Sequence, residues 1–221
     1  MGKCDLRPGE LFEEIPEDLQ GYFEEVSYVW ELLPKIKEII KDLLEKHKDD
    51  SYELKEGILI GKGVTIASTA VILPPAFIGN GVEIRPGAYL RGNVYIGDNC
   101  VVGNSSELKN CILLPFAQVP HYNYVGDSIL GSHSHMGAGA ICSNLKGDGR
   151  NVVVHAEKDY ETGLRKFGAI LGEGAEIGCG SVLNPGTIIG KNTQVYPLTM
   201  CRGVYPSDSI VKSTKEIVRK K

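Results

Sequence analysis

An aliphatic residue returns at every sixth position from residue 60 to residue 114, and this period limits the folds open to the chain. The positions are Ile60, Ile66, Ile72, Ile78, Ile84, Leu90, Ile96, Val102, Leu108 and Leu114. A period of six fits neither an α-helix nor a simple alternating strand, so each unit must be a short strand followed by a corner. Glycine and proline gather between these positions, as in Arg85-Pro-Gly87, where a corner needs them. The pattern predicts an all-β solenoid, a parallel β-helix.

A second series, mostly small or β-branched, follows four residues after each aliphatic position. It reads Val64, Ala70, Ala76, Val82, Ala88, Val94, Cys100, Ser106 and Ile112, with Gln118 as a polar exception. The hexad spacing returns at Leu130 and Met136, and again from Leu171 to Val195. With three hexads to a coil, we expect about six coils stacked about 4.8 Å apart.

Composition and charge narrow the functional classes. The 221 residues are 42% hydrophobic and 24% charged, which is ordinary for a globular protein. A net charge of −4 argues against nucleic acid or an anionic membrane as the main partner. The first residues lack the apolar run of a signal peptide, and no stretch is long and apolar enough to span a membrane. We therefore expect a cytoplasmic protein whose six cysteines stay reduced.

Residues 1–50 differ in kind from the repeat. Apolar residues at Ile36, Ile39, Ile40, Leu43 and Leu44 have helical spacing, and Pro34 stands where a helix can begin. Apolar residues between positions 22 and 33 predict a further helical piece. Because the first coil of a solenoid has an open end, we expect this segment to cap that end or to pack on a neighbouring subunit.

Two interruptions break the repeat. Pro120 and Leu130 are ten residues apart where the period requires twelve, and the slipped piece is His121-Tyr-Asn-Tyr-Val-Gly-Asp127. Local breaks of a rule often mark functional sites. The second interruption, at about 145–169, is polar and predicts a loop or arm that leaves the solenoid. The solenoid domain is predicted over 57–211, followed by a basic tail over 212–221.

Three motifs in the middle of the chain resemble a known family. They are Gly103-Asn-Ser-Ser-Glu-Leu-Lys109, the slipped piece 121–127, and Gly137-Ala-Gly-Ala with Asn144 following. They resemble the C-terminal β-helix domain of the bacterial bifunctional glucosamine-1-phosphate acetyltransferase/N-acetylglucosamine-1-phosphate uridyltransferase. Residues 161–172 are similar to archaeal-type sugar-1-phosphate nucleotidyltransferases that carry the same domain. The resemblance covers about residues 57–211 and implies a left-handed coil, against the general preference for right-handed crossovers.

The resemblance implies a reaction, the transfer of an acetyl group from acetyl-CoA to the amine of an amino-sugar phosphate in nucleotide-sugar biosynthesis. An amine attacks a thioester only when it is neutral, so the site needs a base, and histidine suits this role. His121 falls on the family's catalytic base and Glu107 on the carboxylate that orients it. A backbone N–H near Ala138 would face the developing oxyanion. Family members are homotrimers.

Substrate contacts are implied in the same way. Arg91 and Lys109 fall on basic positions that contact the phosphate, which suits a dianion, and Tyr124 falls on a sugar-phosphate contact. The family's asparagine that contacts the amino sugar is replaced here by His135, which leaves the identity of the sugar open.

Cofactor contacts complete the set of candidate residues. The positions that touch acetyl-CoA correspond to Ala138, Asn144 and Cys179, and the family usually has serine at the last. No tightly bound metal is expected. The sequence has no glycine-rich signature of a pyrophosphorylase, so we do not expect uridyl transfer from this chain alone.

Two other interpretations stay open. A γ-class carbonic anhydrase binds zinc with three histidines on the same fold, and this chain has His121, His133, His135 and His155, although their spacing does not match that class. Alternatively, the chain is a non-catalytic β-helix that serves as partner or regulatory module of a separate nucleotidyltransferase. Stabilisation by acetyl-CoA would separate an enzyme from an inert module.

Overall fold

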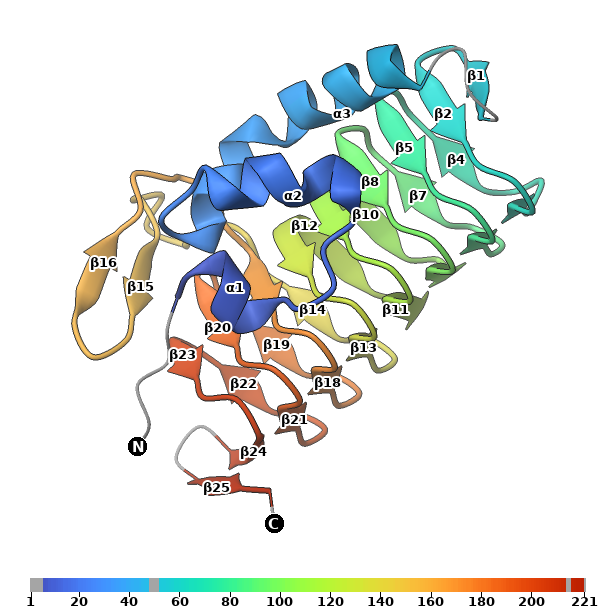
Figure 1. Ribbon diagram of the computed structural model, residues 1–221. Coiled ribbons are helices and arrows are strands. Elements are labelled where there is room, and N and C mark those ends of the chain that lie inside the picture. Colours follow the sequence, from blue (N-terminus) through green and yellow to red (C-terminus); the bar gives the residue numbers. More distant parts are fainter. Residues whose placement is uncertain (1–5, 48–51, 214–215, 221) are drawn as a thin grey trace.

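The computed structural model describes residues 6–47, 52–213 and 216–220, in which the middle of the chain winds into a solenoid with three faces of parallel strands (Figure 1). Each coil gives one short strand to each face, and β10 (Glu107–Leu113) and β12 (Tyr124–Leu130) bend across the corner between two faces. The structure confirms the predicted β-solenoid and its parallel pairing.

We name the faces A, B and C. Face A holds the second halves of β10 and β12 together with β2 (Ile58–Ile60), β5 (Ala76–Ile78), β8 (Val94–Ile96), β17 (Ala169–Leu171), β20 (Thr187–Ile189) and β23 (Val204–Tyr205). Face B holds β3 (Thr65–Ile66), β6 (Glu83–Ile84), β9 (Val101–Asn104), β11 (Gln118–His121), β13 (His135–Met136), β18 (Glu176–Ile177), β21 (Gln194–Val195) and β24 (Ser209–Ser213). Face C holds the first halves of β10 and β12 together with β4 (Val71–Ile72), β7 (Tyr89–Leu90), β14 (Ile141–Cys142), β19 (Val182–Leu183) and β22 (Met200–Cys201).

The repeat positions point into the solenoid. From Ile78 to Leu108 the aliphatic positions are almost fully buried and share one core with small partners such as Ala88 and Cys100. Face B has eight parallel strands among the described residues, so the solenoid has more coils than the hexads alone indicated. The additional coils come from residues 113–125 and 201–211, whose spacing departs from six.

Two coils in the middle of the solenoid are one residue shorter than the coils before them. Ile60, Ile78 and Ile96 pair at intervals of eighteen residues, whereas Leu113 and Leu130 follow at intervals of seventeen. Both shortenings fall at the corner between faces C and A, at residues 109–110 and 126–127. The second shortening lies between Pro120 and Leu130, where we expected a break, whereas the first lies upstream, and our prediction of a single break missed it.

The first shortening also changes which side chains face inward, because a slip of one residue moves a strand's side chains to the opposite face. Leu113 and Ala117 lie in the interior core, where we expected Leu114 and Gln118. Ile112, which we placed inside, belongs instead to a second core outside face A. The apparent polar exception at Gln118 disappears in the correct register.

The N-terminal helices lie along face A, whereas we expected them over the open end of the first coil (Figure 1). They are α1 (Pro8–Leu11), α2 (Glu17–Glu24), the 3-10 helix η1 (Val29–Lys35) and α3 (Ile36–Lys46). α3 buries the expected apolar stripe against β5, β8 and β10. Face A needs this cover because the middle residue of its strands is apolar and points outward, as at Leu59, Phe77, Tyr95, Ile112, Ile129, Ile170 and Ile188.

The insertion and the tail both contain strands. The insertion forms a hairpin of β15 (Val153–His155) and β16 (Asp159–Glu161), and its Val152, Val154 and Phe167 join the second core. In the tail, β25 (Glu216–Arg219) pairs antiparallel with β24. β1 (Glu53–Lys55) pairs with β2 before the first coil. None of the described helices is long and apolar enough to cross a membrane.

Candidate active site

Three predicted site residues lie on successive coils at the corner between faces B and C, which we call the B–C corner. The Gly139 N–H donates to the His121 carbonyl at 3.0 Å, and the Gly180 N–H donates to the Ala138 carbonyl at 2.8 Å. His121, Ala138 and Cys179 therefore occupy equivalent positions, one above the other, and all three are exposed. The structure thus brings the expected base into one line with two of the expected acetyl-CoA contacts.

A buried asparagine holds this corner. The His121 N–H donates to Asn123 Oδ1 at 3.0 Å, and the amide of Asn123 donates to the carbonyls of Gly137 and Ala140. Asn123 takes the inward position that small residues fill in the neighbouring coils, and it is 2% exposed. We did not single it out, although an asparagine at a small-residue position was a readable signal. Within the described chain, the His121 imidazole itself has no hydrogen-bonded side-chain partner and is open to a substrate.

Glu107 and Arg91 form an ion pair on face C, with 2.7 Å between Oε1 and the guanidinium. We expected Glu107 to orient His121 and Arg91 to hold a phosphate. The structure instead turns the carboxylate toward the guanidinium, and the hydrogen bond from Arg91 to Glu107 raises the pKa of Arg91. Arg91 is thus held in place before any substrate arrives.

Asp127 is the centre of a buried polar cluster at the corner between faces C and A. Its carboxylate, 7% exposed, lies 3.3 Å from Lys109 Nζ and accepts hydrogen bonds from the amides of Asn110 and Asn144. Asn110 also donates to the Leu33 carbonyl, which ties the cluster to the N-terminal helices. From the sequence, we named Asp127 only as the last residue of the slipped piece. Its position at a shortened corner, in the left-handed backbone region at φ 48°, was the signal.

Tyr124 lies beside this cluster. A Cβ on Gly126 would come within 2.5 Å of the Tyr124 hydroxyl and 2.8 Å of the Asn144 amide nitrogen, so only glycine lets both side chains cross here. Burial and the nearby carboxylates of Asp127 and Glu107 raise the pKa of Tyr124. Its phenol therefore stays protonated at neutral pH and can donate a hydrogen bond.

We expect Asp127→Asn to destabilise the protein by about 2–4 kcal/mol. The substitution leaves the Lys109 ammonium without its counter-charge, and it replaces one acceptor oxygen by an NH₂ group that faces two other amide donors. Urea unfolding measures the effect. Asp148→Asn is the matched control, because the Asp148 carboxylate meets Lys146 at the surface, and we expect no measurable change. Equal stabilities of the two variants would contradict the central role of Asp127.

The histidines lie apart from one another. His135 lies on face B, with its Nδ1 3.4 Å from Glu176, and it lines a cavity of about 440 Å³ together with Cys179. His133 stacks on Phe116, and His155 lies on the inserted hairpin. The described residues contain no group of three His, Cys, Asp or Glu side chains placed to hold a metal ion. The geometry gives no support to the zinc interpretation.

Comparison with known proteins supports the resemblance. Residues 72–160 match the family model described as GMPPB C-terminal domain. The bifunctional protein GlmU of Methanococcus aeolicus is 36% identical over 220 residues, an alignment that covers 91% of this chain and 50% of the relative. A bifunctional sugar-1-phosphate nucleotidylyltransferase/acetyltransferase of Sulfurisphaera tokodaii is 29% identical, over 81% of this chain and 46% of the relative. The chain thus spans about half the length of the curated relatives it matches.

Solved structures with lower similarity include the acetyltransferase domain of PglB from Neisseria gonorrhoeae. It is 17% identical with a TM-score of 0.45, over 83% of this chain and 66% of that one. A perosamine N-acetyltransferase mutant from Caulobacter crescentus, in complex with CoA and GDP-perosamine, is also 17% identical, with a TM-score of 0.35 over 82% of this chain and 63% of that one.

Proposed function

We propose that this GlmU homologue is an acetyl-CoA-dependent N-acetyltransferase that acts on an amino-sugar 1-phosphate or a nucleotide amino sugar, in the biosynthesis of nucleotide sugars. One observation carries the proposal: the exposed His121 imidazole stands in line with exposed Ala138 and Cys179 and three residues before Tyr124. The relatives named GlmU and nucleotidylyltransferase/acetyltransferase support the same activity.

The arrangement assigns a role to each residue. The B–C corner receives the thioester, because its exposed residues Ala138 and Cys179 are small and leave room. His121 accepts a proton from the substrate amine as the nitrogen attacks the thioester carbonyl. A backbone N–H near Ala138 stabilises the oxyanion. The carbon–sulfur bond then breaks, and CoA leaves as its thiol with the proton that His121 took from the amine.

The phosphate of the substrate binds on face C, toward the corner between faces C and A. Arg91 and Lys109 lie on neighbouring strand ends, each already held by a carboxylate, so both cations are positioned without loss of side-chain freedom on binding. Tyr124 donates a hydrogen bond to the sugar phosphate. His135 and Asn144 complete the contacts to the amino sugar and to acetyl-CoA.

Release of free thiol from acetyl-CoA tests the proposal, screened over glucosamine-1-phosphate, galactosamine-1-phosphate and UDP-linked amino sugars. We expect turnover with one of them and a higher melting temperature in the presence of acetyl-CoA. If no sugar is acetylated and acetyl-CoA leaves the melting temperature unchanged, the chain is the non-catalytic partner of a separate nucleotidyltransferase.

Cys179 offers a direct probe of the cofactor position. Burial raises the pKa of the Cys100 and Cys142 thiols to about 12 and that of Cys201 to about 11, so these thiols react slowly. Cys179 is exposed. We expect iodoacetamide to label Cys179 in the native protein, and CoA to slow this labelling at least about tenfold, as measured by peptide mass spectrometry. Labelling that CoA leaves unchanged would remove Cys179 from the cofactor site.

We further propose a cytoplasmic homotrimer. Face C presents exposed apolar residues that suit packing against another copy: Val71 and Tyr89 lie on one side of Glu107 and Tyr124, and Ile141 lies on the other. Light scattering is expected to give three times the mass of the chain, and a monomer at micromolar concentration would contradict the assembly.

A further inference from the structure

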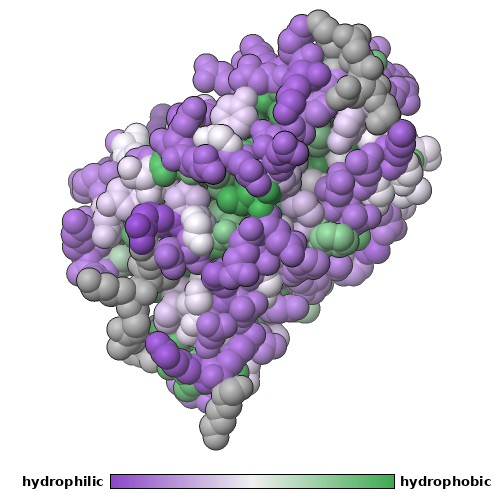
Figure 2. All heavy atoms as spheres, in the orientation of Figure 1, coloured by the Kyte–Doolittle hydropathy of each residue, from purple (hydrophilic) through white to green (hydrophobic). Residues whose placement is uncertain are grey.

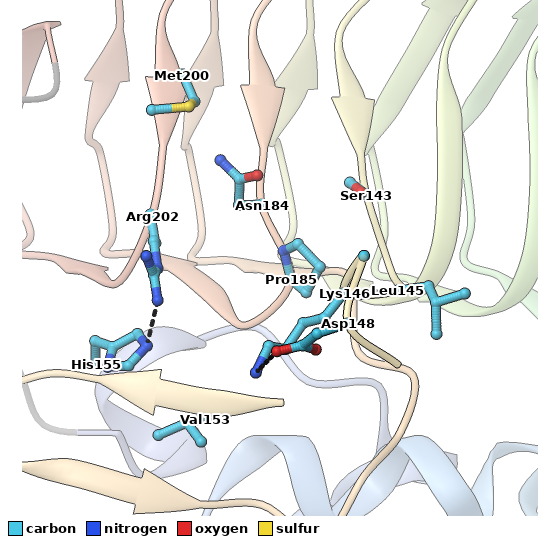
Figure 3. A pocket seen from close by; sticks show the side chains of 11 residues that line it. Ser143, Leu145, Lys146, Asp148, Val153, His155, Asn184, Pro185, Met200 and Arg202 are labelled. Carbon is cyan, nitrogen blue, oxygen red and sulfur yellow. Dashed lines mark hydrogen bonds and ion pairs between the residues drawn. The ribbon is translucent and has the colours of Figure 1, made fainter. Parts of the chain in front are cut away.

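A cavity of about 390 Å³ lies between the inserted hairpin and the coils, on the side of face C opposite the B–C corner (Figure 3). Its floor comes from residues that follow β14, β19 and β22, and its wall comes from β15 and the loop before it. Two cations, Lys146 and Arg202, line it. None of the residues assigned to acetyl transfer lines this cavity.

The partner of Arg202 is a neutral side chain. His155 Nδ1 lies 2.8 Å from the Asp159 carboxylate, and His155 Nε2 lies 3.0 Å from an Arg202 guanidinium nitrogen (Figure 3). A guanidinium only donates hydrogen bonds, so Nε2 must accept, and the single ring proton must lie on Nδ1. The imidazole therefore holds Arg202 in place without neutralising it. The Asp159 carboxylate lies on the other side of the imidazole ring.

The remaining walls suit a ligand with one anionic end. Lys146 reaches the same space and forms one ion pair among the described residues, with the Asp148 carboxylate at 3.5 Å (Figure 3). Leu145 and Met200 are 43% and 55% exposed and offer apolar surface at opposite ends of the cavity, with Met200 on the side of Arg202 (Figure 3). An arginine, a lysine and an apolar wall together favour a phosphate attached to a ring.

We propose that this cavity binds a phosphorylated small molecule, with its phosphate on Arg202 and Lys146 and its ring against Met200. The volume accommodates a nucleoside monophosphate or a sugar phosphate, but it is too small for the whole of CoA. The site goes beyond the proposed acetyl transfer and does not depend on it, because no residue is shared.

Calorimetric titration with uridine monophosphate and with inorganic phosphate, without acetyl-CoA, tests the site. We expect uridine monophosphate to bind in the millimolar range or tighter, and more tightly than inorganic phosphate because only the nucleotide has a ring. Arg202→Gln is expected to weaken binding at least about tenfold. Arg219→Gln, in β25, is the matched control and is expected to bind like the parent.

Two substitutions of His155 test the charge argument. His155→Gln keeps a neutral acceptor for Arg202 and is expected to bind the nucleotide like the parent. His155→Glu places a carboxylate on the same guanidinium and is expected to weaken binding, with the melting temperature of each variant as the check on folding. The proposal is overturned if the parent binds neither probe in the millimolar range, if Arg202→Gln binds like the parent, or if the two His155 variants bind equally.

Discussion

His121→Ala is expected to lower the turnover of acetyl-CoA by about a hundredfold or more, with little change in stability. The imidazole is exposed and has no side-chain partner in the described chain, so its removal leaves no buried group unsatisfied. What is lost is the acceptor for the amine proton, and without it the nitrogen cannot attack efficiently. Steady-state thiol release with the sugar identified in the screen, together with a melting curve, measures both quantities.

His133→Ala is the matched control for His121→Ala. His133 is also exposed, with 51% of its side chain accessible, and also lies at a corner of the solenoid, but it stacks on Phe116 at the corner between faces A and B. We expect parental turnover from this variant. Parental turnover from His121→Ala would show that another group accepts the proton, and equal losses in both variants would point to a general effect of removing a surface histidine.

Gly103→Ala is expected to cost more than about 4 kcal/mol and to prevent normal folding, which places it among the most damaging single substitutions. Gly103 lies in β9, directly beside the next coil. A Cβ built on it would lie 1.5 Å from the Pro120 carbonyl oxygen, which is backbone and cannot turn aside as a flexible side chain can. Either β9 or β11 must move, and β11 carries His121. Soluble yield and urea unfolding measure the loss.

Gly21→Ala is the matched control for Gly103→Ala. Gly21 lies inside α2, where an added Cβ meets nothing within 4 Å. Since alanine favours a helix over glycine, we expect this variant to gain about 0.5–1 kcal/mol. If Gly103→Ala folds with parental stability, β9 and β11 do not approach each other as closely as the structure places them.

The sequence alone determined the solenoid and its interior. From residue 78 to residue 108 the aliphatic hexad positions lie in the core as predicted, because a period of six returns a side chain to the same inward position on each face. α3 was also predictable, since its apolar stripe has helical spacing. The surface that α3 covers was also predictable from the sequence, although we expected α3 to cover the open end of the first coil. Face A carries apolar triplets such as Ala76-Phe-Ile78, and a strand that is apolar on both sides must be buried on both sides.

The sequence predicted which residues belong to the candidate site, but not how their side chains are paired. The motifs named His121, Lys109 and Asn144, but only the coiled chain shows that Asp127 joins the last two and that Glu107 meets Arg91. Each of these partners lies one coil away, sixteen to eighteen residues along the chain. A contact across coils depends on the register between them, and the one-residue shortenings at 109–110 and 126–127 set that register.

The tertiary structure also decided what the N-terminal helices and the inserted hairpin cover. The sequence of an amphipathic helix indicates that one of its faces is apolar, but not which of several apolar surfaces that face packs against. Here face A offered the largest outward apolar surface, and both segments pack on it. Figure 2 shows some hydrophobic residues at the surface in the middle of this face. A cavity of about 500 Å³ beside the start of α2 is lined by Phe77, Tyr95 and Phe116. The repeat in the sequence thus dictates the coil, because its spacing is local, whereas contacts between coils and with the covering segments depend on register and shape, which exist only in the folded chain.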